Sequence, residues 1–293
     1  MKTVLVPTDF SRYAQRAADR AIRLGSAGVR RVHLVHVHQA PKFGAARPRA
    51  DVTRMMAREC ERLERQIVRA RMPRTSVTTH LLKGEPYVEI IRLSRELEAD
   101  VIVLGCKGAG QRPDKVLGRT AARVARMADT PVLVVRRIAD APYGRPLVAL
   151  PLDPSASRLV KLAQAASDPS ASPVSAVRAY WVPFPGLLDE GTDTEPTRYH
   201  KEVRAKAEQE IRALAKSLER KGAPIRPQLR RGDARSVILT EAAKMRADLV
   251  VLGTHGRSGL AHMLLGSVAE WILVNASADV LVARPVRFTF EIP

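Results

Sequence analysis

The chain has 293 residues, enough for about two domains, and 45% of them are hydrophobic, so each domain can bury a core. Only 4% are aromatic, which predicts mainly aliphatic cores. The formal net charge is +19, and the two cysteines, the lack of an apolar leader and the lack of a membrane-spanning apolar run argue against a secreted, disulfide-rich or transmembrane protein; we therefore expect a cytoplasmic one.

The basic residues are concentrated in the first half of the chain. Residues 1–143 contain 28 Lys and Arg against 14 Asp and Glu, whereas the remainder contains 21 against 16. Attraction to nucleic acid or another acidic partner is one interpretation. We favour solvated, arginine-rich helix faces, because no aromatic residues alternate with the arginines to stack on bases.

Strand and helix patterns alternate along residues 1–138. Val4–Val6 predicts a buried strand, and Ser11 can cap a helix that has an alanine face and ends at Gly25. Further strands are expected at 32–37, 76–82, 101–104 and 131–135, and helices at 51–71, 86–98 and 117–128. The helix at 51–71 is expected to direct five side chains inward, namely those of Val52, Met56, Cys60, Leu63 and Ile67.

Residues 145–286 repeat this order and define a second domain. Gly105 and Gly253 end matching runs that are 148 positions apart, whereas Pro7–Asp9 matches Pro151–Asp153 at an offset of 144. Strands are expected near 146–151, 174–181, 226–230, 249–252 and 280–283, and helices near 155–167, 196–221, 234–246 and 265–275.

The final segment, 287–293, alternates apolar and polar residues, which predicts an extra strand at a sheet edge or in a homodimer contact.

A helix separates each predicted strand from the next in both domains. This alternation implies that the strands pair parallel and that helices cover both faces of each sheet, so the fold class is α/β and Rossmann-like. Such sheets bind ligands beyond the carboxyl ends of their strands.

A glycine pattern lies at one of these strand ends. In the second copy, Gly253 and Gly256 are followed after nine residues by Gly266 and Ser267, where a strand gives way to a helix. Free amides at a helix start favour a phosphate, and glycines allow a close approach. Asp153, at the end of the first strand, can accept hydrogen bonds from ribose hydroxyls.

These motifs resemble those of the universal stress protein family, in tandem and over almost the whole chain. The resemblance implies two five-stranded parallel sheets in the order 3-2-1-4-5, paired through their fifth strands. It also implies ATP or another adenine nucleotide as ligand and a role in stress adaptation; Mg²⁺ can accompany such a nucleotide. The implied binding residues of the second copy are Pro151, Leu152, Asp153, Ala179, Gly253, Gly256, Arg257, Gly266, Ser267 and Val268.

The first copy departs further from the pattern, at Arg119 and in the loop 109–115. Its weaker candidates are Thr8, Asp9, Val37, Gly105, Gly108, Gly118 and Thr120. Arg119 stands where the pattern has Ser or Thr, and it could hold phosphate or pair with Asp9 instead. We therefore expect the second copy to bind most of the nucleotide.

No other motif predicts a catalytic centre. His33, His36 and His38 share a strand, and His36 and His38 lie on the same face of it. No third metal ligand is evident beside these two, so packing or surface roles are favoured over a metal site. No residue is placed to activate water, so a nucleotide-binding regulator is favoured over an enzyme. The alternatives are a slow ATPase or autophosphorylating enzyme, and a nucleotide-independent interaction protein that uses the basic first half.

Overall fold

The computed structural model describes residues 1–24, 28–39, 49–70, 72, 74–108, 117–181, 195–254 and 265–284. The predicted segment 287–293, Gly256 and Arg257 lie outside these ranges. Within the described residues, no helix is both long and apolar enough to cross a membrane.

The described residues of the first half form five strands and four helices, which confirms the predicted order. They are β1 (Thr3–Pro7), α1 (Arg12–Ala21), β2 (Arg31–His38), α2 (Arg49–Arg69), β3 (Ser76–Lys83), α3 (Pro86–Glu96), β4 (Val101–Gly105), α4 (Arg119–Met127) and β5 (Val132–Val135). Ser11 caps α1 as expected, because its side chain accepts a hydrogen bond from the amide of Ala14.

The second half repeats this order, with one extra short helix that we had not predicted. Its elements are β6 (Pro146–Ala149), α5 (Ser155–Ala166), the 3-10 helix η1 (Pro169–Ala171), β7 (Val174–Tyr180), α6 (Glu195–Arg220), β8 (Ile225–Arg231), α7 (Ala234–Lys244), β9 (Leu249–Gly253), α8 (Ser267–Asn275) and β10 (Asp279–Ala283).

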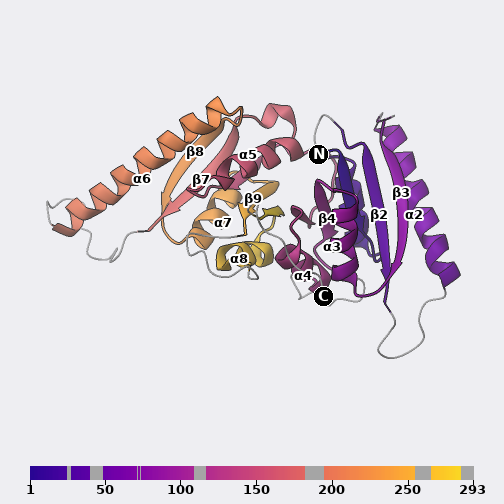
Figure 1. Ribbon diagram of the computed structural model, residues 1–293. Helices are drawn as coiled ribbons and strands as arrows, with labels where there is room; N and C mark the ends of the chain where they lie inside the picture. The colour runs from indigo at the N-terminus through magenta and orange to yellow at the C-terminus, as the bar shows by residue number, and fades with distance from the viewer. Residues whose placement is uncertain are drawn as a thin grey trace.

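The two halves share one ten-stranded sheet in the order β3-β2-β1-β4-β5-β10-β9-β6-β7-β8. Each half therefore has the expected order 3-2-1-4-5, with parallel neighbours. The fifth strands β5 and β10 pair antiparallel, with Leu133 opposite Leu281, so what we expected as two sheets is continuous. Figure 1 shows α2 beside β3 at one end of the molecule and α6 beside β8 at the other.

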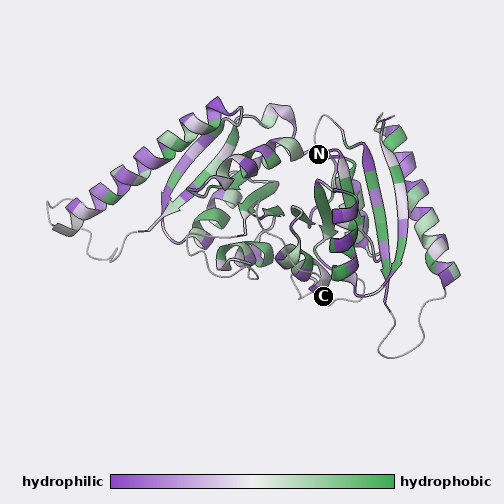
Figure 2. Ribbon diagram, in the orientation of Figure 1, coloured by the Kyte–Doolittle hydropathy of each residue, from purple (hydrophilic) through white to green (hydrophobic). Residues whose placement is uncertain are grey.

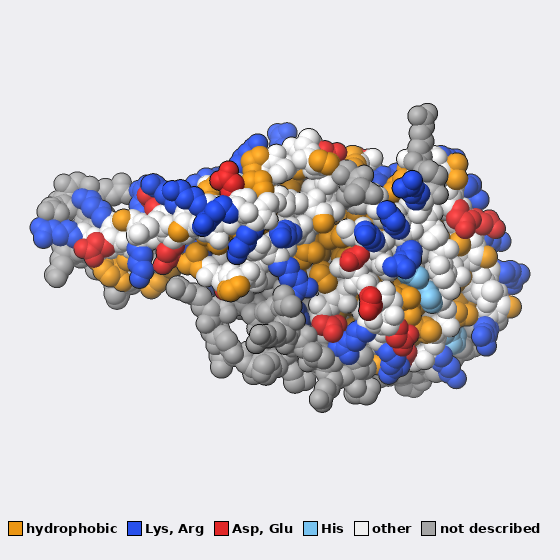
Figure 3. Space-filling model, turned by 45° about the horizontal axis from the view of Figure 1, so that its top comes forward, with side chains coloured by type: hydrophobic (Ala, Val, Ile, Leu, Met, Phe, Trp, Pro, Cys, Tyr) orange, Lys and Arg blue, Asp and Glu red, His pale blue; other side chains and the backbone are white. Residues whose placement is uncertain are grey.

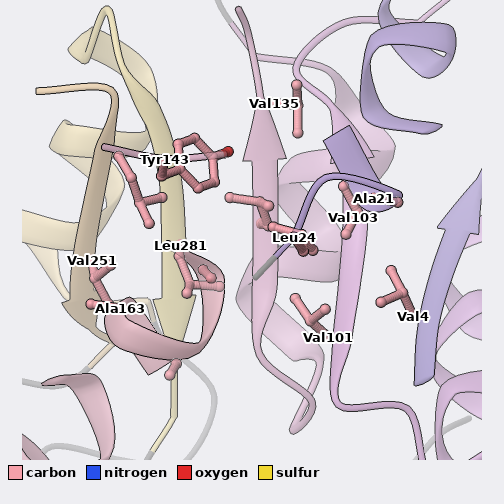
Figure 4. Close-up of a cluster of buried hydrophobic side chains, with 14 of the residues drawn as sticks. Val4, Ala21, Leu24, Val101, Val103, Val135, Tyr143, Ala163, Val251 and Leu281 are labelled. Atoms are coloured by element: carbon pink, nitrogen blue, oxygen red, sulfur yellow. The ribbon is translucent and has the colours of Figure 1, made fainter. Parts of the chain in front are cut away.

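Apolar side chains fill both faces of this sheet. One buried cluster joins the strands to α1, α2, α5 and α6, and the other joins them to α3, α4, α7 and α8. Figure 2 shows the resulting contrast between largely apolar central strands and helices with mixed faces. Figure 4 draws Val251 and Leu281 of the second half in the same cluster as Val4 and Val103 of the first, so the first cluster crosses the boundary between the halves.

Helix α2 differs from its prediction at one position. Cys60 is half-buried, whereas Glu59 is buried and pairs with Arg62 over 2.7 Å. The pairing allows a carboxylate to occupy the inner face, since its charge is neutralised there. The other four predicted inward residues are buried.

The strand register corrects the repeat alignment at the start of each half. Val4 pairs with Val101, and Pro146 pairs with Leu249. Val101 and Leu249 are 148 positions apart, as predicted, but Val4 and Pro146 are 142 apart. The predicted offset of 144 is therefore wrong for this segment.

The helices that follow support the same offset of 142. Ala14, Ala17, Ala18 and Ala21 are buried in α1, and Ala156, Leu159, Val160 and Ala163 are buried at the corresponding positions of α5. Arg16 donates to the carbonyl of Arg136, and Arg158 donates to the carbonyl of Arg284. The burial pattern of the helix and the arginine that donates to a carbonyl thus both repeat at this offset.

Candidate functional site

Each half has a cavity at the carboxyl ends of its central strands. The first has a volume of about 250 Å³ and lies between β1, β2, β4 and the starts of α3 and α4. Its lining residues are Pro7, Thr8, Asp9, Ala14, Val35, His36, Val37, Pro86, Ile90, Leu104, Gly105, Lys107, Gly108, Gly118, Arg119, Thr120 and Ala121.

The second cavity has nearly the same volume, about 240 Å³, and lies between the equivalent elements. Its lining residues are Ala149, Leu150, Pro151, Val177, Arg178, Ala179, Ala234, Ile238, Leu252, Gly253, Thr254, Gly266, Ser267, Val268 and Ala269. The duplicated sequence has therefore produced a duplicated cavity.

The same backbone hydrogen bonds frame both cavities. The amide of Gly118 donates to Cys106 over 2.7 Å, and that of Gly266 donates to Thr254 over 2.7 Å. Each bond holds the start of a helix, α4 or α8, against the end of a strand. The first-turn amides of that helix consequently lie at the cavity, where they favour an anion.

Asp9 gives the first cavity a carboxylate. Its Oδ1 accepts a hydrogen bond from the amide of Ser11 over 3.0 Å, which fixes the side chain at the end of β1. A Cβ atom added to Gly108 would lie 2.9 Å from Asp9 Oδ2, so any larger residue there would make the carboxylate shift. A carboxylate next to a glycine can accept hydrogen bonds from a ligand's hydroxyl groups, because no side chain of the glycine blocks their approach.

Asp153 makes the same local hydrogen bond as Asp9, from the amide two residues further on, but it does not line the second cavity. With the offset of 142, Pro151 corresponds to Asp9, and Asp153 corresponds to the capping residue Ser11. Asp153 is exposed and outside the cavity lining, and it accepts hydrogen bonds from the amide and hydroxyl of Ser155 at the start of α5. The described lining of the second cavity therefore contains no carboxylate.

The remaining predicted residues divide between the two cavities. Pro151, Ala179, Gly253, Gly266, Ser267 and Val268 line the second, and all seven candidates of the first copy line the first. Leu152 joins Asp153 outside the lining. Sequence reasoning missed Lys107 in the first cavity and Arg178 in the second, although each lies next to or near a predicted residue.

Gly105 has a packing role as well as a place in the lining. A Cβ atom there would lie 2.6 Å from the carbonyl carbon and oxygen of Tyr13 in α1. Backbone atoms cannot rotate away as a side chain can. The glycine therefore allows α1 to approach β4 closely, whatever the cavity holds.

The histidines make contacts that their spacing did not predict. His36 lines the first cavity, and its Nδ1 lies 2.8 Å from the carbonyl of Thr8. His33 Nδ1 lies 3.0 Å from Nε2 of His80 on the neighbouring strand. Within the described part of the chain, no three His, Cys, Asp or Glu side chains are grouped to hold a metal ion.

Comparison with known proteins identifies the family of this duplicated fold. The model of the universal stress protein family matches residues 1–136 and again residues 142–284. The chain belongs to the universal stress protein family. The model matches each half once, so this is a tandem member with two copies of the domain.

Relatives agree with this assignment. The chain is 30% identical over 215 residues to a universal stress protein of Mycobacterium tuberculosis, covering 71% of this chain and 69% of that protein. It is 37% identical over 102 residues to a universal stress protein of Methanocaldococcus jannaschii, a match that covers 35% of this chain and only 58% of that protein.

Solved structures resemble the whole chain. A universal stress protein of Archaeoglobus fulgidus superposes with a TM-score of 0.64 at 19% identity, over 96% of this chain and 98% of that one. A Pseudomonas aeruginosa protein of unknown function gives a TM-score of 0.66 at 19% identity, over 98% and 93%. At this identity the likeness concerns the fold.

Proposed function

We propose that this universal stress protein binds an adenine nucleotide and acts in stress adaptation through the bound ligand. The observation that carries the proposal is the first cavity, where Asp9 and the start of α4 face one space of about 250 Å³ at the carboxyl ends of parallel strands. A nucleotide needs acceptors for its sugar hydroxyls and amide donors for its phosphates. This cavity contains both.

Each part of a nucleotide has a matching group in the first cavity. The Asp9 carboxylate can accept hydrogen bonds from ribose hydroxyls, and the first-turn amides of α4 can donate to phosphate. The apolar side chains of Val35, Val37 and Ile90 offer a surface for the base. Mg²⁺ enters this proposal only through the phosphates, because the described residues contain no group of three metal-binding side chains.

The two halves differ in which end of the nucleotide they are equipped for. The sequence pattern predicts the second half as the main site, and Gly266 and Ser267 at the start of α8 support that prediction at the phosphate end. Pro151 in place of Asp9 opposes it at the ribose end. We therefore propose the first half as the tighter site.

Two carboxylate variants separate these alternatives. Nucleotide released by denaturing the purified protein would be identified first, and ATP binding would then be measured by calorimetry. Asp9→Ala should weaken ATP binding by about tenfold or more, since hydrogen bonds to a charged acceptor contribute about 1.5–3 kcal/mol. Asp153→Ala, the matched control, should change affinity by no more than about twofold, as expected for an exposed charge.

The opposite result would assign the tighter nucleotide site to the second half. If Asp153→Ala weakens ATP binding and Asp9→Ala does not, the glycine pattern is the better guide. If ATP and adenosine bind neither wild type nor variants, the proposed function is wrong. The enzymatic alternative predicts phosphate release from ATP that is lost in Asp9→Ala.

A further inference from the structure

The sheet ends at two edge strands, β3 in the first half and β8 in the second. Among the described residues, β3 pairs with β2 alone, and in a parallel pair the backbone groups of successive residues face opposite sides. The amides of Ser76 and Gly84 donate to carbonyls in and next to β2, so the residues at even positions bond to that strand. The backbone groups that point away from the sheet are those of Val77, Thr79, Leu81 and Lys83.

This outward row of β3 is open along its length. In the described part of the chain, none of its amides and carbonyls has a hydrogen-bond partner. The strand is eight residues long, contains no proline and includes the β-branched Val77, Thr78 and Thr79. Figure 1 shows it at one end of the sheet. An edge of this kind is a template for a further strand.

The equivalent edge in the second half is interrupted. The amide of Gly232 donates to the carbonyl of Tyr180, so the outward groups of β8 belong to its odd-numbered residues. One of these is Pro227, which corresponds to Thr79 at the offset of 148. Proline has no amide hydrogen, so β8 lacks a donor at the position where β3 has one.

Positive charge also distinguishes the two edges. β8 contains Arg226, Arg230 and Arg231, whereas the one Lys or Arg of β3 is its last residue, Lys83. Figure 3 shows further Lys and Arg side chains along α6, which packs beside β8. Two copies joined through β8 would bring these like charges together, which opposes their association. Of the two edges, β3 is therefore the one suited to a second copy.

β3 is complementary to itself when two copies run antiparallel about a twofold axis at Thr79. Thr79 then lies opposite Thr79 of the second copy, and Val77 lies opposite Leu81. Pairs of β-branched and of apolar residues stabilise antiparallel strands. Lys83 lies beyond these pairs, so no like charges meet. Such an interface uses the same surface on both chains and closes after two.

A groove beside Val77 fits the leucine of the second copy. It lies between the end of α2 and the start of β3, has a volume of about 610 Å³ and is lined by Glu64, Ile67, Val68, Met72, Thr75, Ser76 and Val77. Val77 packs against the buried cluster that includes α2, and residues directly opposite in a sheet share a face. Leu81 of the second copy would therefore enter this groove and cover Val68, which is 76% exposed.

We infer that β3 pairs with β3 of a second copy, so that two chains form a dimer with one continuous sheet. The chain already joins its own halves by this geometry, since β5 and β10 pair antiparallel with Leu133 opposite Leu281. The dimer involves neither cavity and is independent of the proposed nucleotide binding.

Sedimentation velocity of the full chain, from low to high micromolar concentration and without added nucleotide, tests the inference. Wild type should sediment as a dimer that dissociates on dilution. Thr79→Pro installs the residue of β8 and removes an outward amide while it leaves the bonds to β2 intact. It should raise the dissociation constant of the dimer by about tenfold or more. Leu81→Lys should do the same, because it places a charge in the apolar groove.

Leu229→Lys is the matched control, because Leu229 corresponds to Leu81, is equally half-buried and lies on the other edge. It should change the dissociation constant by no more than about twofold. The inference is overturned if wild type is monomeric at every concentration, if the dimer survives both β3 variants, or if Leu229→Lys weakens it as much as Leu81→Lys. Should Thr79→Pro fail to fold, Leu81→Lys decides, since it alters no backbone group.

Discussion

The hydroxyl of Tyr143 donates a hydrogen bond to Oδ2 of Asp279 over 2.6 Å, and both side chains are completely buried. Tyr143 lies between the two halves, and Asp279 begins β10. Burial and the neighbouring Asp279 carboxylate raise the pKa of Tyr143 well above its usual value, so the phenol remains a donor.

Asp279 is also the acceptor for the chain that leaves β5. Its Oδ1 accepts from the amides of Arg136 and Arg137 over 2.7 and 3.0 Å. Buried Arg20, whose guanidinium lies 4.0 Å from the Tyr143 ring centre, forms an ion pair with Oδ2 at 3.5 Å. One carboxylate therefore ties α1, the linker and β10 together.

We predict that this cluster stabilises the joined halves. Tyr143→Phe should lower the free energy of unfolding by about 1–3 kcal/mol, because a buried charged acceptor loses a donor. Asp279→Ala should cost about 3–5 kcal/mol, because Arg20 would be left buried without its anion. Urea denaturation would measure both. Tyr199→Phe is the control, since Tyr199 is 51% exposed; losses no larger than its own would disprove the role of the cluster.

Gly105 provides a test of packing near the cavity. Gly105→Ala should destabilise the protein by about 1–3 kcal/mol, because its Cβ would overlap the backbone of Tyr13 and force α1 away from β4. Gly144→Ala is the matched control, since the nearest atom to its added Cβ is Asp248 Oδ2 at 3.9 Å. Equal thermal denaturation midpoints for the two variants would contradict the close approach of α1.

The His33–His80 pair predicts a loss of stability in acid. Burial lowers the pKa of His33, and His80 and Arg31 lower it further; burial also lowers the pKa of His80, although Glu96 opposes this. The folded pair therefore takes up protons less readily than the unfolded chain, whose histidines titrate near about 6.5. The contribution of this pair to the free energy of unfolding is therefore fully present above that pH and is lost as the pH falls below it.

His80→Gln tests this pH dependence. The variant should show a flatter decline in stability between about pH 7 and pH 5 than wild type, since one depressed pKa is removed. His38→Gln, on the same sheet and half-exposed, should keep the wild-type slope. The ring centres of His33 and His80 are 5.2 Å apart, so the 3.0 Å contact is nearly linear and needs one proton-free nitrogen. Unchanged slopes in His80→Gln would refute the prediction.

Equivalent helix starts should respond differently to the loss of their acidic residue. Asp233 accepts hydrogen bonds from the amides of Arg235 and Ser236 at the start of α7, whereas the equivalent Glu85 caps α3 with no such bond. Asp233→Ala should therefore cost about 1 kcal/mol of unfolding free energy. Glu85→Ala should cost less, because it loses an exposed ion pair with Arg123 and an exposed hydrogen bond from Gln39 but no bond to the helix amides. The reverse order in urea denaturation would contradict this assignment.

Some contacts could not be found from the repeat because their partners are exchanged. In the first half Arg123 lies 5.0 Å from the ring centre of Tyr87, and in the second Arg235 lies 5.6 Å from that of Trp271. Tyr87 corresponds to Arg235, and Arg123 to Trp271. The contact is kept while each residue type changes, so comparing single positions shows two differences and hides one interaction.

The sequence alone determined the order of strands and helices, since apolar runs, helical periodicity and the Ser11 cap are local signals. Together with the family resemblance it also predicted the strand order and the pairing of β5 with β10. It could not place the start of the second half. Offsets of 142 and 144 differ by two residues, and a two-residue shift leaves every strand side chain on the same face of the sheet.

Only the tertiary structure could distinguish these two alignments. The pairing of Pro146 with Leu249 and the buried face of α5 involve residues far apart in the chain, and no local pattern encodes them. With that register Asp153 lies at a helix start and not in the cavity, and Pro151 takes the position in the second half that Asp9 has in the first. The described glycines Gly105, Gly118, Gly253 and Gly266 could be placed from the sequence because they mark strand ends and helix starts, which are local signals, whereas the carboxylate beside them was decided by long-range hydrogen bonding and packing.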